Sequence, residues 1–413
     1  MAKFDKDVLT KVHQLRSATA ATFQEKWNQS EENARFYRLL QYSETQLQKM
    51  TEKNRVPYVL DYITPVINTF LGIQRDQRTD IAYLPVEADD EMRCEVLNSV
   101  KDSVMRINGF QYLESDVFED GIIEKTGFLG YEWSTEKCPL GEIKMFRIPP
   151  RQMVWDLNRR DYSLQSASWV SRTRMYQKRA LANKFPDRQK EIFKMNLASS
   201  MIDSLKLDPS YMKMITDSEL DSVALVEFFE RSYNDKFFLY VDGELSDQVY
   251  NSQKEADKDI REQMQKFEAL SSQFTQNGQV PPPPPSMQVK RQSTPVVLKS
   301  EVVHDMVLTD TEEIDEPFYP YDQYVPFWHD GEWWGIMDTV KDSQRFINKT
   351  FLMIDHQMST GSKGLLTIDE NVPEAKANEI IKSWGSTGGA VRMPDPKNNL
   401  HFVPPTGLDP RLI

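Results

Sequence analysis

The densest group of side chains that could do chemistry is a run of carboxylates between His304 and Glu316. The acids of this run are Asp305, Asp310, Glu312, Glu313, Asp315 and Glu316. Carboxylates that converge can hold two Mg²⁺ ions, as in metal-dependent nucleases. A two-metal site usually draws its acids from separate strands, whereas acids in one short run are typical of a solvated turn. We therefore expect no metal here, and a metal-dependent DNA-processing enzyme is the alternative interpretation.

Motifs for other chemistries are missing from the sequence. It contains no phosphate-binding Gly-x-x-x-x-Gly-Lys-Ser/Thr, no zinc-binding His-Glu-x-x-His and no Gly-x-Ser-x-Gly nucleophile turn. The five histidines are scattered, and Cys94 and Cys138 are too few for a disulfide framework. We expect both cysteines to be free thiols. The sequence thus predicts no catalytic residue, no cofactor and no metal site.

The composition is that of an acidic globular chain. Its 413 residues are 39% hydrophobic and 27% charged, with a net charge of -13, and the length suits two or three domains. Such a charge argues against a protein that grips nucleic acid over most of its surface. The polar start from Met1 to Asp5 predicts no signal peptide. No apolar run reaches the roughly 20 residues that span a bilayer, so we expect an intracellular protein without a membrane partner.

Hydrophobic spacing predicts helices in the first third of the chain and strands after it. Helical spacing extends over Asn54–Arg78, where Pro65 should begin or kink the helix, and again up to Gly127. Between these helices, Tyr83–Ala88 has a strand-like pattern. After Gly127, short alternating segments predict strands, two of them antiparallel and joined by a turn near Asn234–Asp235. The middle of the chain is therefore expected to be an α/β domain.

A polar segment rich in Gln and Ser runs from Ser252 to Gln292 and contains five consecutive prolines, Pro281–Pro285. Its first half is typical of an exposed helix, and its proline-rich half of a flexible polyproline II excursion. Strand-like alternation resumes at Thr294. Because a proline run can dock on an aromatic groove, a cytosolic scaffold protein is a third interpretation. Deletion of Gln279–Ser286 would then abolish partner binding.

A long helix is predicted from Ile336 to Ser359, about 36 Å at 1.5 Å per residue. Two heptad-spaced series run along it and form one largely apolar seam. The seam residues are Val340, Gln344, Ile347, Phe351, Ile354 and Met358. Such a seam requires a neighbouring helix, either in the same chain or in another copy. Lys341, Arg345 and Lys349 lie four residues apart on another face.

The segment leading into this helix resembles the one that leads into the stem helix of tailed-bacteriophage portal proteins of the podovirus-type (P22-like) family. In that family a proline–aromatic pair and a glycine precede Val/Leu and then Asp-x-Gln-Arg-x-x-Asn-Lys. The matching residues here are Pro326, Phe327, Gly335, Val340, Asp342, Gln344, Arg345, Asn348 and Lys349.

Three further segments resemble the family in the same order along the chain. Asn54–Arg78 is similar to its early helix, and Phe118–Trp133 looks like the segment that enters the wing sheet. In the early helix the matching residues are Gly72 and Arg75. The stretch Phe146–Val170 is similar to a third family segment, and the matching residues there are Pro150, Val154, Asp156 and Asp161. The resemblance extends over most of Asn54–Pro404.

The resemblance implies an α+β portal architecture with N-terminal helices, an α/β wing, a long stem helix and a small α/β clip. The expected regions are N-terminal helices at 1–60, the wing at 61–251, a flexible insertion at 252–293, wing return strands at 294–330, the stem helix at 331–360, the clip at 361–408 and the start of a returning stem helix at 409–413. Family members continue with a second stem helix, a tunnel loop and usually a crown. We expect these in a longer version of this chain or in another polypeptide.

The resemblance also implies a structural virion protein rather than an enzyme. Such proteins form a ring, usually of twelve copies, at one capsid vertex, and double-stranded DNA passes through its channel during packaging and ejection. The implied partners are the terminase (packaging motor), the major capsid protein, the scaffolding protein and tail adaptor proteins, met first in the host cytoplasm. The seam would pack on stem helices, including those of neighbouring copies. Lys341, Arg345 and Lys349 would face the channel or pair with carboxylates.

The clip is expected to bear on the packaging motor and later on the tail. Its predicted elements are a strand at Leu365–Ile368, a helix at Pro373–Trp384 and strands near Ala390–Val391 and His401–Phe402. The candidate docking residues on the helix are Lys376, Glu379, Lys382 and Trp384.

Overall fold

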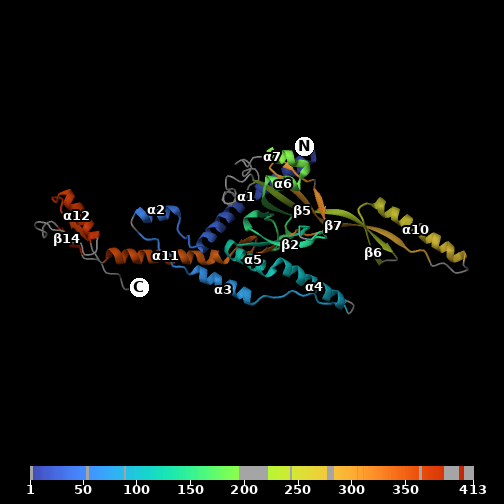
Figure 1. Ribbon diagram of the computed structural model, residues 1–413, viewed down its shortest axis with the longest axis horizontal. Coiled ribbons are helices and arrows are strands. Elements are labelled where there is room, and N and C mark those ends of the chain that lie inside the picture. Colours follow the sequence, from blue (N-terminus) through green and yellow to red (C-terminus); the bar gives the residue numbers. More distant parts are fainter. Residues whose placement is uncertain are drawn as a thin grey trace. The chain divides into compact units, whose positions relative to one another are not determined.

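A computed structural model of the chain describes residues 3–52, 55–87, 90–136, 138–194, 222–241, 244–276, 283–304, 306–309, 311–361, 365–385 and 400–403 (Figure 1). Helices account for 50% and strands for 27% of the residues described, which confirms the expected α+β class. It divides into two compact units. Unit 1 comprises Met1–Glu31 and Gln74–Gly335, and unit 2 comprises Glu32–Ile73 and Ile336–Ile413.

The helices of unit 1 come mostly before and between its strands. Helix α1 (Lys3–Tyr37) contributes its first part to this unit. Further along the chain come α4 (Glu91–Asn108), α5 (Phe110–Glu124), α6 (Lys178–Lys184), α7 (Gln189–Lys194) and α10 (Gln253–Gln276). Gly109 separates α4 from α5 with φ +60°, a left-handed conformation that glycine adopts without strain. Its N–H donates to the carbonyl of Arg106 and so closes α4.

Antiparallel sheets form the centre of unit 1. Within the described residues, the larger sheet has seven strands, and five of them follow the order β3-β4-β5-β7-β8. These are β3 (Met153–Trp155), β4 (Trp169–Gln177), β5 (Ser222–Val241), β7 (Met287–Val303) and β8 (Met306–Val307), while β6 (Glu244–Tyr250) pairs with β5 and β9 (Glu312–Ile314) with β7. A second sheet has the order β10-β1-β2, from Tyr321–Tyr324, Gly127–Ser134 and Glu142–Ile148. The hairpin of β11 (Phe327–His329) and β12 (Glu332–Trp334) follows.

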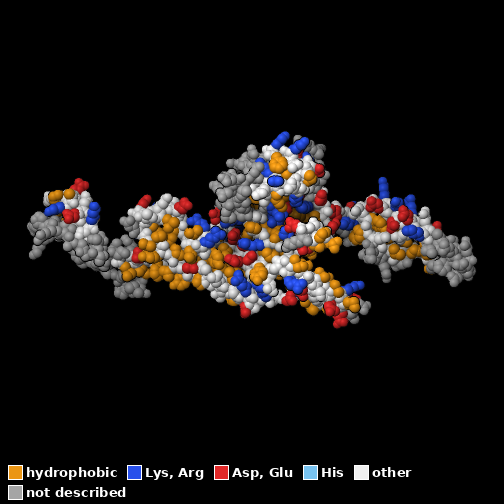
Figure 2. Space-filling view, in the orientation of Figure 1, with side chains coloured by type: hydrophobic (Ala, Val, Ile, Leu, Met, Phe, Trp, Pro, Cys, Tyr) orange, Lys and Arg blue, Asp and Glu red, His pale blue; other side chains and the backbone are white. Residues whose placement is uncertain are grey.

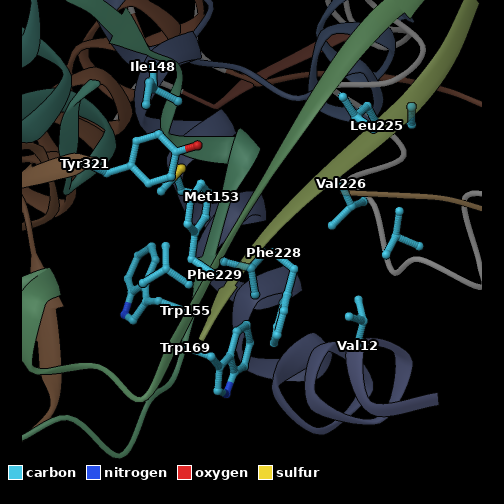
Figure 3. Close-up of a cluster of buried hydrophobic side chains, with 14 of the residues drawn as sticks. Val12, Ile148, Met153, Trp155, Trp169, Leu225, Val226, Phe228, Phe229 and Tyr321 are labelled. Carbon is cyan, nitrogen blue, oxygen red and sulfur yellow. The ribbon is translucent and has the colours of Figure 1, made fainter. Parts of the chain in front are cut away.

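The core of unit 1 lies between α1 and the larger sheet, with side chains from the second sheet joining it (Figure 3). The first part of β5, Ser222–Phe229, is buried at every position, as expected of a strand covered on both faces. Val12 and Phe23 of α1 belong to this core. The guanidinium of Arg16 is also enclosed there, and it donates to the hydroxyls of Ser171 and Thr173. Burial lowers the pKa of Arg16 to about 10.

Two local predictions for unit 1 are wrong. The expected turn near Asn234–Asp235 does not occur, because β5 continues through these residues as one strand. Its ladder with β7 runs from Val226 to Val241, and Asp235 forms an ion pair with Arg291 on β7. The expected strand at Tyr83–Ala88 is also missing from the residues that the structure describes there. The backbone of Tyr83 is instead bound on both sides by the side-chain amide of Asn98, at 2.9 and 3.0 Å.

The polar segment after Tyr250 forms the predicted helix, which is α10. The following strand β7 starts at Met287, before the predicted resumption at Thr294. Its pairing with β5 extends the strand into the polar sequence, since each residue as far as Met287 has a partner on β5. Pro281 and Pro282 lie outside the described residues, and Pro283–Pro285 have no regular secondary structure.

Unit 2 contains the end of α1, α2 (Glu44–Glu52), most of α3 (Ile63–Asp76) and α11 (Ile336–Gly361). The long helix predicted from Ile336 is confirmed as α11. The last elements are β13 (Leu365–Ile368), α12 (Glu374–Gly385) and β14 (Leu400–Val403), and β13 pairs with β14 antiparallel. These match the predicted elements of the clip, whereas the strand expected at Ala390–Val391 lies outside the described residues.

Candidate functional site on helix α11

Helix α11 has one buried face, and most of the side chains on that face are polar. Met337, Lys341, Gln344 and Asn348 are 0%, 8%, 1% and 3% exposed. Their spacing of four, three and four residues places them one above another on a helix. Three of these four side chains are polar, so their burial requires hydrogen-bond partners.

Gln344 and Asn348 hold the segment before α3 against the helix. The backbone N–H of Tyr62 donates to Gln344 Oε1 at 3.1 Å, and that of Leu60 donates to Asn348 Oδ1 at 3.2 Å. Gln344 Nε2 donates to the carbonyl of Leu60 and, at 3.0 Å, to Asn348 Oδ1. Asn348 Nδ2 in turn donates to Gln41 Oε1 at 2.5 Å. The two amides therefore satisfy backbone groups that a neighbouring strand would otherwise satisfy.

The held segment leads directly into α3. Asp61 lies between the two bound residues, and its carboxylate accepts the N–H groups of Ile63 and Thr64 at 3.2 and 3.0 Å. This satisfies donors at the start of a helix that lack a partner within it. Gln344 and Asn348 thus fix the point from which α3 begins.

A charged cluster lies next to these amides. Lys341 Nζ donates to Glu32 Oε2 and Asn33 Oδ1, both at 2.9 Å, and Asn33 Nδ2 donates to Asp338 Oδ1 at 3.0 Å. Arg345 also binds Glu32 and lies over the ring of Phe36, 5.2 Å from its centroid. Burial raises the pKa of Glu32, but hydrogen bonds and charges from Lys341 and Arg345 outweigh this effect. The pKa of Glu32 is therefore lowered.

The three basic residues of α11 separate into different roles. Lys341 is buried, and its ammonium group forms an ion pair with Glu32. Of the two roles expected of it, facing a channel or pairing with a carboxylate, the structure shows the pairing. Arg345 is partly exposed and pairs with Glu32 and Asp342. Lys349 is exposed and has no ion pair among the described residues.

The seam of α11 is enclosed at its start and open at its end. Gln344 is buried, and Val340 and Ile347 are half-buried. Later along the helix, exposure rises to 43% for Phe351, 42% for Ile354 and 68% for Met358.

A cavity of about 440 Å³ opens between the end of α1, α2 and α11. Its charged lining consists of Glu32, Arg35, Arg345 and Lys349, and its apolar lining includes Phe36 and Leu352. The cations outnumber the single acid, so the cavity is positive in character. Lys349 therefore lies at a positive surface of unit 2.

The residues expected to dock partners lie on α12. Lys376, Glu379 and Lys382 are exposed, and Ile380 between them in sequence is buried. The side chain of Trp384 lies outside the described residues.

The carboxylate run is only partly described. Asp305 and Asp310 lie outside the described residues. Glu313 accepts from Asn234 Nδ2 at 2.6 Å and pairs with Lys236 Nζ at 3.2 Å, and it lies in strand β9 and not in the solvated turn expected of this run. Among the side chains that the structure describes, no group of three or more His, Cys, Asp or Glu gathers as metal ligands would.

Two glycines of the motifs allow close backbone approaches in unit 1. A Cβ on Gly335 would lie 2.5 Å from the carbonyl oxygen of Ile122, and one on Gly121 would lie 2.3 Å from the ring of Tyr324. Such distances exclude any larger residue unless the neighbouring backbone or ring moves. The glycine before the long helix is therefore required where α5 meets the residues after β12.

Sequence reasoning missed the partners of α11 on the N-terminal side. Glu32, Asn33 and Gln41 bind its buried polar side chains, but they come about 300 residues earlier in the chain. Nothing local marks them, because acids and amides on an N-terminal helix are ordinarily solvent-exposed. The signal that the sequence does contain is that Lys341, Gln344 and Asn348 recur at the spacing of one helix face, so that they would be buried together and need partners.

Comparison with protein families gives one match over nearly the whole chain. A family model described as Phage P22-like portal protein matches residues 13–409. No curated protein matches the chain. None of the helices within the described residues has both the length and the apolar character needed to cross a membrane.

Proposed function

Since the chain belongs to the P22-like family of phage portal proteins, we propose that it is the subunit of a ring crossed by double-stranded DNA during packaging and ejection. The family consists of structural, non-enzymatic head–tail connectors of the virion that serve genome packaging. In this proposal the subunit has a wing, a stem and a clip, and α11 is the stem helix.

The main support for ring formation is the exposed apolar surface at the end of α11. Beyond the seam residues Phe351, Ile354 and Met358, Phe346 and Met353 are 70% and 62% exposed. Figure 2 shows hydrophobic side chains gathered where Figure 1 places this helix. A helix that exposes so much apolar surface is a typical interaction site. Stem helices of neighbouring copies would cover it.

Helix α4 of unit 1 supports association from a second surface. Within the described residues it buries no side chain. Met92, Val96, Val100 and Ile107 are 76%, 57%, 53% and 57% exposed. A ring contact needs two different surfaces on each subunit, because each copy meets one neighbour on either side. The exposed apolar faces of α4 and α11 supply candidates for both.

Exposed charged residues of α11 and α12 are the candidates for the channel surface and for the docking site. Arg345 and Lys349 are the candidates for the channel surface, since both side chains are exposed. The packaging motor and later the tail adaptor would bind α12 through Lys376, Glu379 and Lys382, which are exposed on a helix anchored by Ile380. The capsid and scaffolding proteins complete the proposed partners. Assembly would take place in the host cytoplasm.

The first test is the mass of the purified chain by native mass spectrometry, followed by negative-stain imaging. We expect closed rings near twelve copies with a central hole. A double variant, Phe351→Glu with Ile354→Glu, should shift the mass towards the monomer. The control Ser343→Glu adds negative charge at an exposed polar position of the same helix and should leave the ring intact. A monomer for the unchanged chain, or equal masses for the double variant and the control, would contradict the proposal.

A further inference from the structure

A strongly basic helical hairpin lies in unit 1. It consists of α6, the 3-10 turn Pro186–Arg188 and α7. Between Lys178 and Lys194 the sequence has six Lys or Arg against two Asp or Glu, a net charge of +4. The whole chain carries -13, so the other residues together carry -17. The hairpin is thus a local reversal of the charge of the protein.

Packing fixes this hairpin in one orientation. Leu181, Ala182 and Ile192 are almost completely buried and belong to the core of unit 1. Lys184 at the end of α6 pairs with the buried carboxylate of Glu301 on β7 at 2.9 Å. The apolar side chains therefore point inwards, Lys178 is also buried, and Arg179, Lys190 and Lys194 are exposed. Figure 2 shows Lys and Arg side chains over the part of unit 1 where Figure 1 places α6 and α7.

Three of these cations are available to a partner. Arg179, Lys190 and Lys194 are exposed and have no ion pair among the described residues. Arg188 forms an ion pair with Glu191 of the same hairpin, at 3.3 Å. The side chain of Phe193 is 47% exposed on the same helix as Lys190 and Lys194. The hairpin therefore offers three exposed positive charges, and its own acids are Asp187 and Glu191.

We propose that this α6–α7 surface binds the phosphates of double-stranded DNA without regard to sequence. DNA presents a dense and regular row of negative charges, and Lys and Arg side chains bind it mainly through phosphate contacts. Because the rest of the chain has a net charge of -17, DNA would be attracted to local basic surfaces such as this one and not to the chain as a whole. Genome packaging brings this polyanion to the protein. This DNA contact would lie on α6 and α7 and not on α11.

The test measures binding of the full chain to a fluorescein-labelled duplex of about 20 base pairs by anisotropy, over a salt series starting at about 50 mM NaCl. The patch variant is R179Q/K190Q/K194Q. The matched control is K254Q/K258Q/R261Q, which removes the same charge from exposed positions on α10. Circular dichroism and native mass of each variant establish that fold and oligomeric state are unchanged.

We expect the patch variant to bind at least about tenfold more weakly at the lowest salt, with a slope of log affinity against log salt flatter by about 2.7, for three lost phosphate contacts. The control should bind as the unchanged chain does. Equal losses in both variants would mean that net charge, not this surface, governs binding, and would overturn the proposal. So would the absence of duplex binding by the unchanged chain. If that chain bound labelled poly-glutamate instead, the surface would be a site for an acidic protein.

Discussion

Lys341 and Glu32 stand 309 positions apart in the sequence, and Lys341 Nζ donates a 2.9 Å hydrogen bond to Glu32 Oε2. The side chain of Lys341 is 10% exposed, and that of Glu32 is 41% exposed. The pair ties the end of α1 to the beginning of α11 inside unit 2. Lys341, for which the sequence leaves open a channel-facing role or a carboxylate pair, therefore helps to attach the long helix.

Removing the ammonium group of Lys341 should destabilise unit 2. In Lys341→Met the apolar stem of the side chain remains, but Glu32 and Asn33 lose a charged donor. Hydrogen bonds to charged groups contribute about 1.5–3 kcal/mol, and we expect a loss in this range in the free energy of unfolding, measured with urea. Lys349→Met changes an exposed residue of the same helix and should stay within about 0.5 kcal/mol. Equal effects of the two substitutions would contradict the assigned role.

Replacing Gln344 should release the segment before α3. Gln344→Leu keeps a buried side chain of similar size but leaves the N–H of Tyr62 and the carbonyl of Leu60 without this partner. An unsatisfied buried polar group costs about 1–3 kcal/mol. Hydrogen exchange at the amide of Tyr62 should accelerate accordingly, whereas Ser343→Leu on the exposed side of the same helix should leave it unchanged. Unaltered exchange in Gln344→Leu would show that the segment is held by other contacts.

The ion pairs of Glu32 should make stability depend on acid pH. The pKa of Glu32 is lowered from 4.5 in the folded chain. A carboxylate of this kind contributes stability that is fully present above its unfolded pKa and is lost as pH falls through the lowered folded pKa. Glu32→Gln should therefore be less stable than the unchanged chain at neutral pH, with the difference shrinking below a pH of about 4.5. A difference that stayed constant down to acid unfolding would refute the ionic contribution.

A methyl group at Gly335 should be poorly tolerated. In Gly335→Ala the new Cβ would meet the carbonyl oxygen of Ile122 at 2.5 Å, and overpacking of this kind costs about 1–3 kcal/mol. Gly72 provides the opposite case, since a Cβ there has nothing within 4 Å and lies inside α3. Gly72→Ala should therefore be neutral or stabilising by up to about 1 kcal/mol. Thermal unfolding of both variants measures the contrast, and the same sign for both would be unexpected.

The periodic elements of this chain could be predicted from the sequence. Helix α11 was predictable because apolar residues recur along it at helical spacing, and β13 and α12 because short apolar runs end at polar turns. The family was predictable from the order of several motifs. These signals are local, and no distant residue is needed to interpret them.

Features set by distant partners could not be predicted in this way. Asn234 and Asp235 have turn chemistry, but the ladder with β7 keeps them in a strand. Spacing alone places Lys341 on a face of α11 without revealing that Glu32 binds it there. The same spacing does not tell whether Gln344 belongs to a seam with another helix or, as observed, holds the backbone of Leu60 and Tyr62.

The pairing of Val241 with Met287 at the far end of β5 and β7 has a practical consequence. The chain leaves one strand at Val241 and rejoins its neighbour at Met287, so the intervening residues begin and end at adjacent points. Beyond Tyr250, the last residue of β6 that pairs with β5, their number can change without altering the register of these strands. This excursion is therefore the natural place for length variation among homologues, and for a purification tag or a fluorescent domain that reports on assembly without disturbing the core.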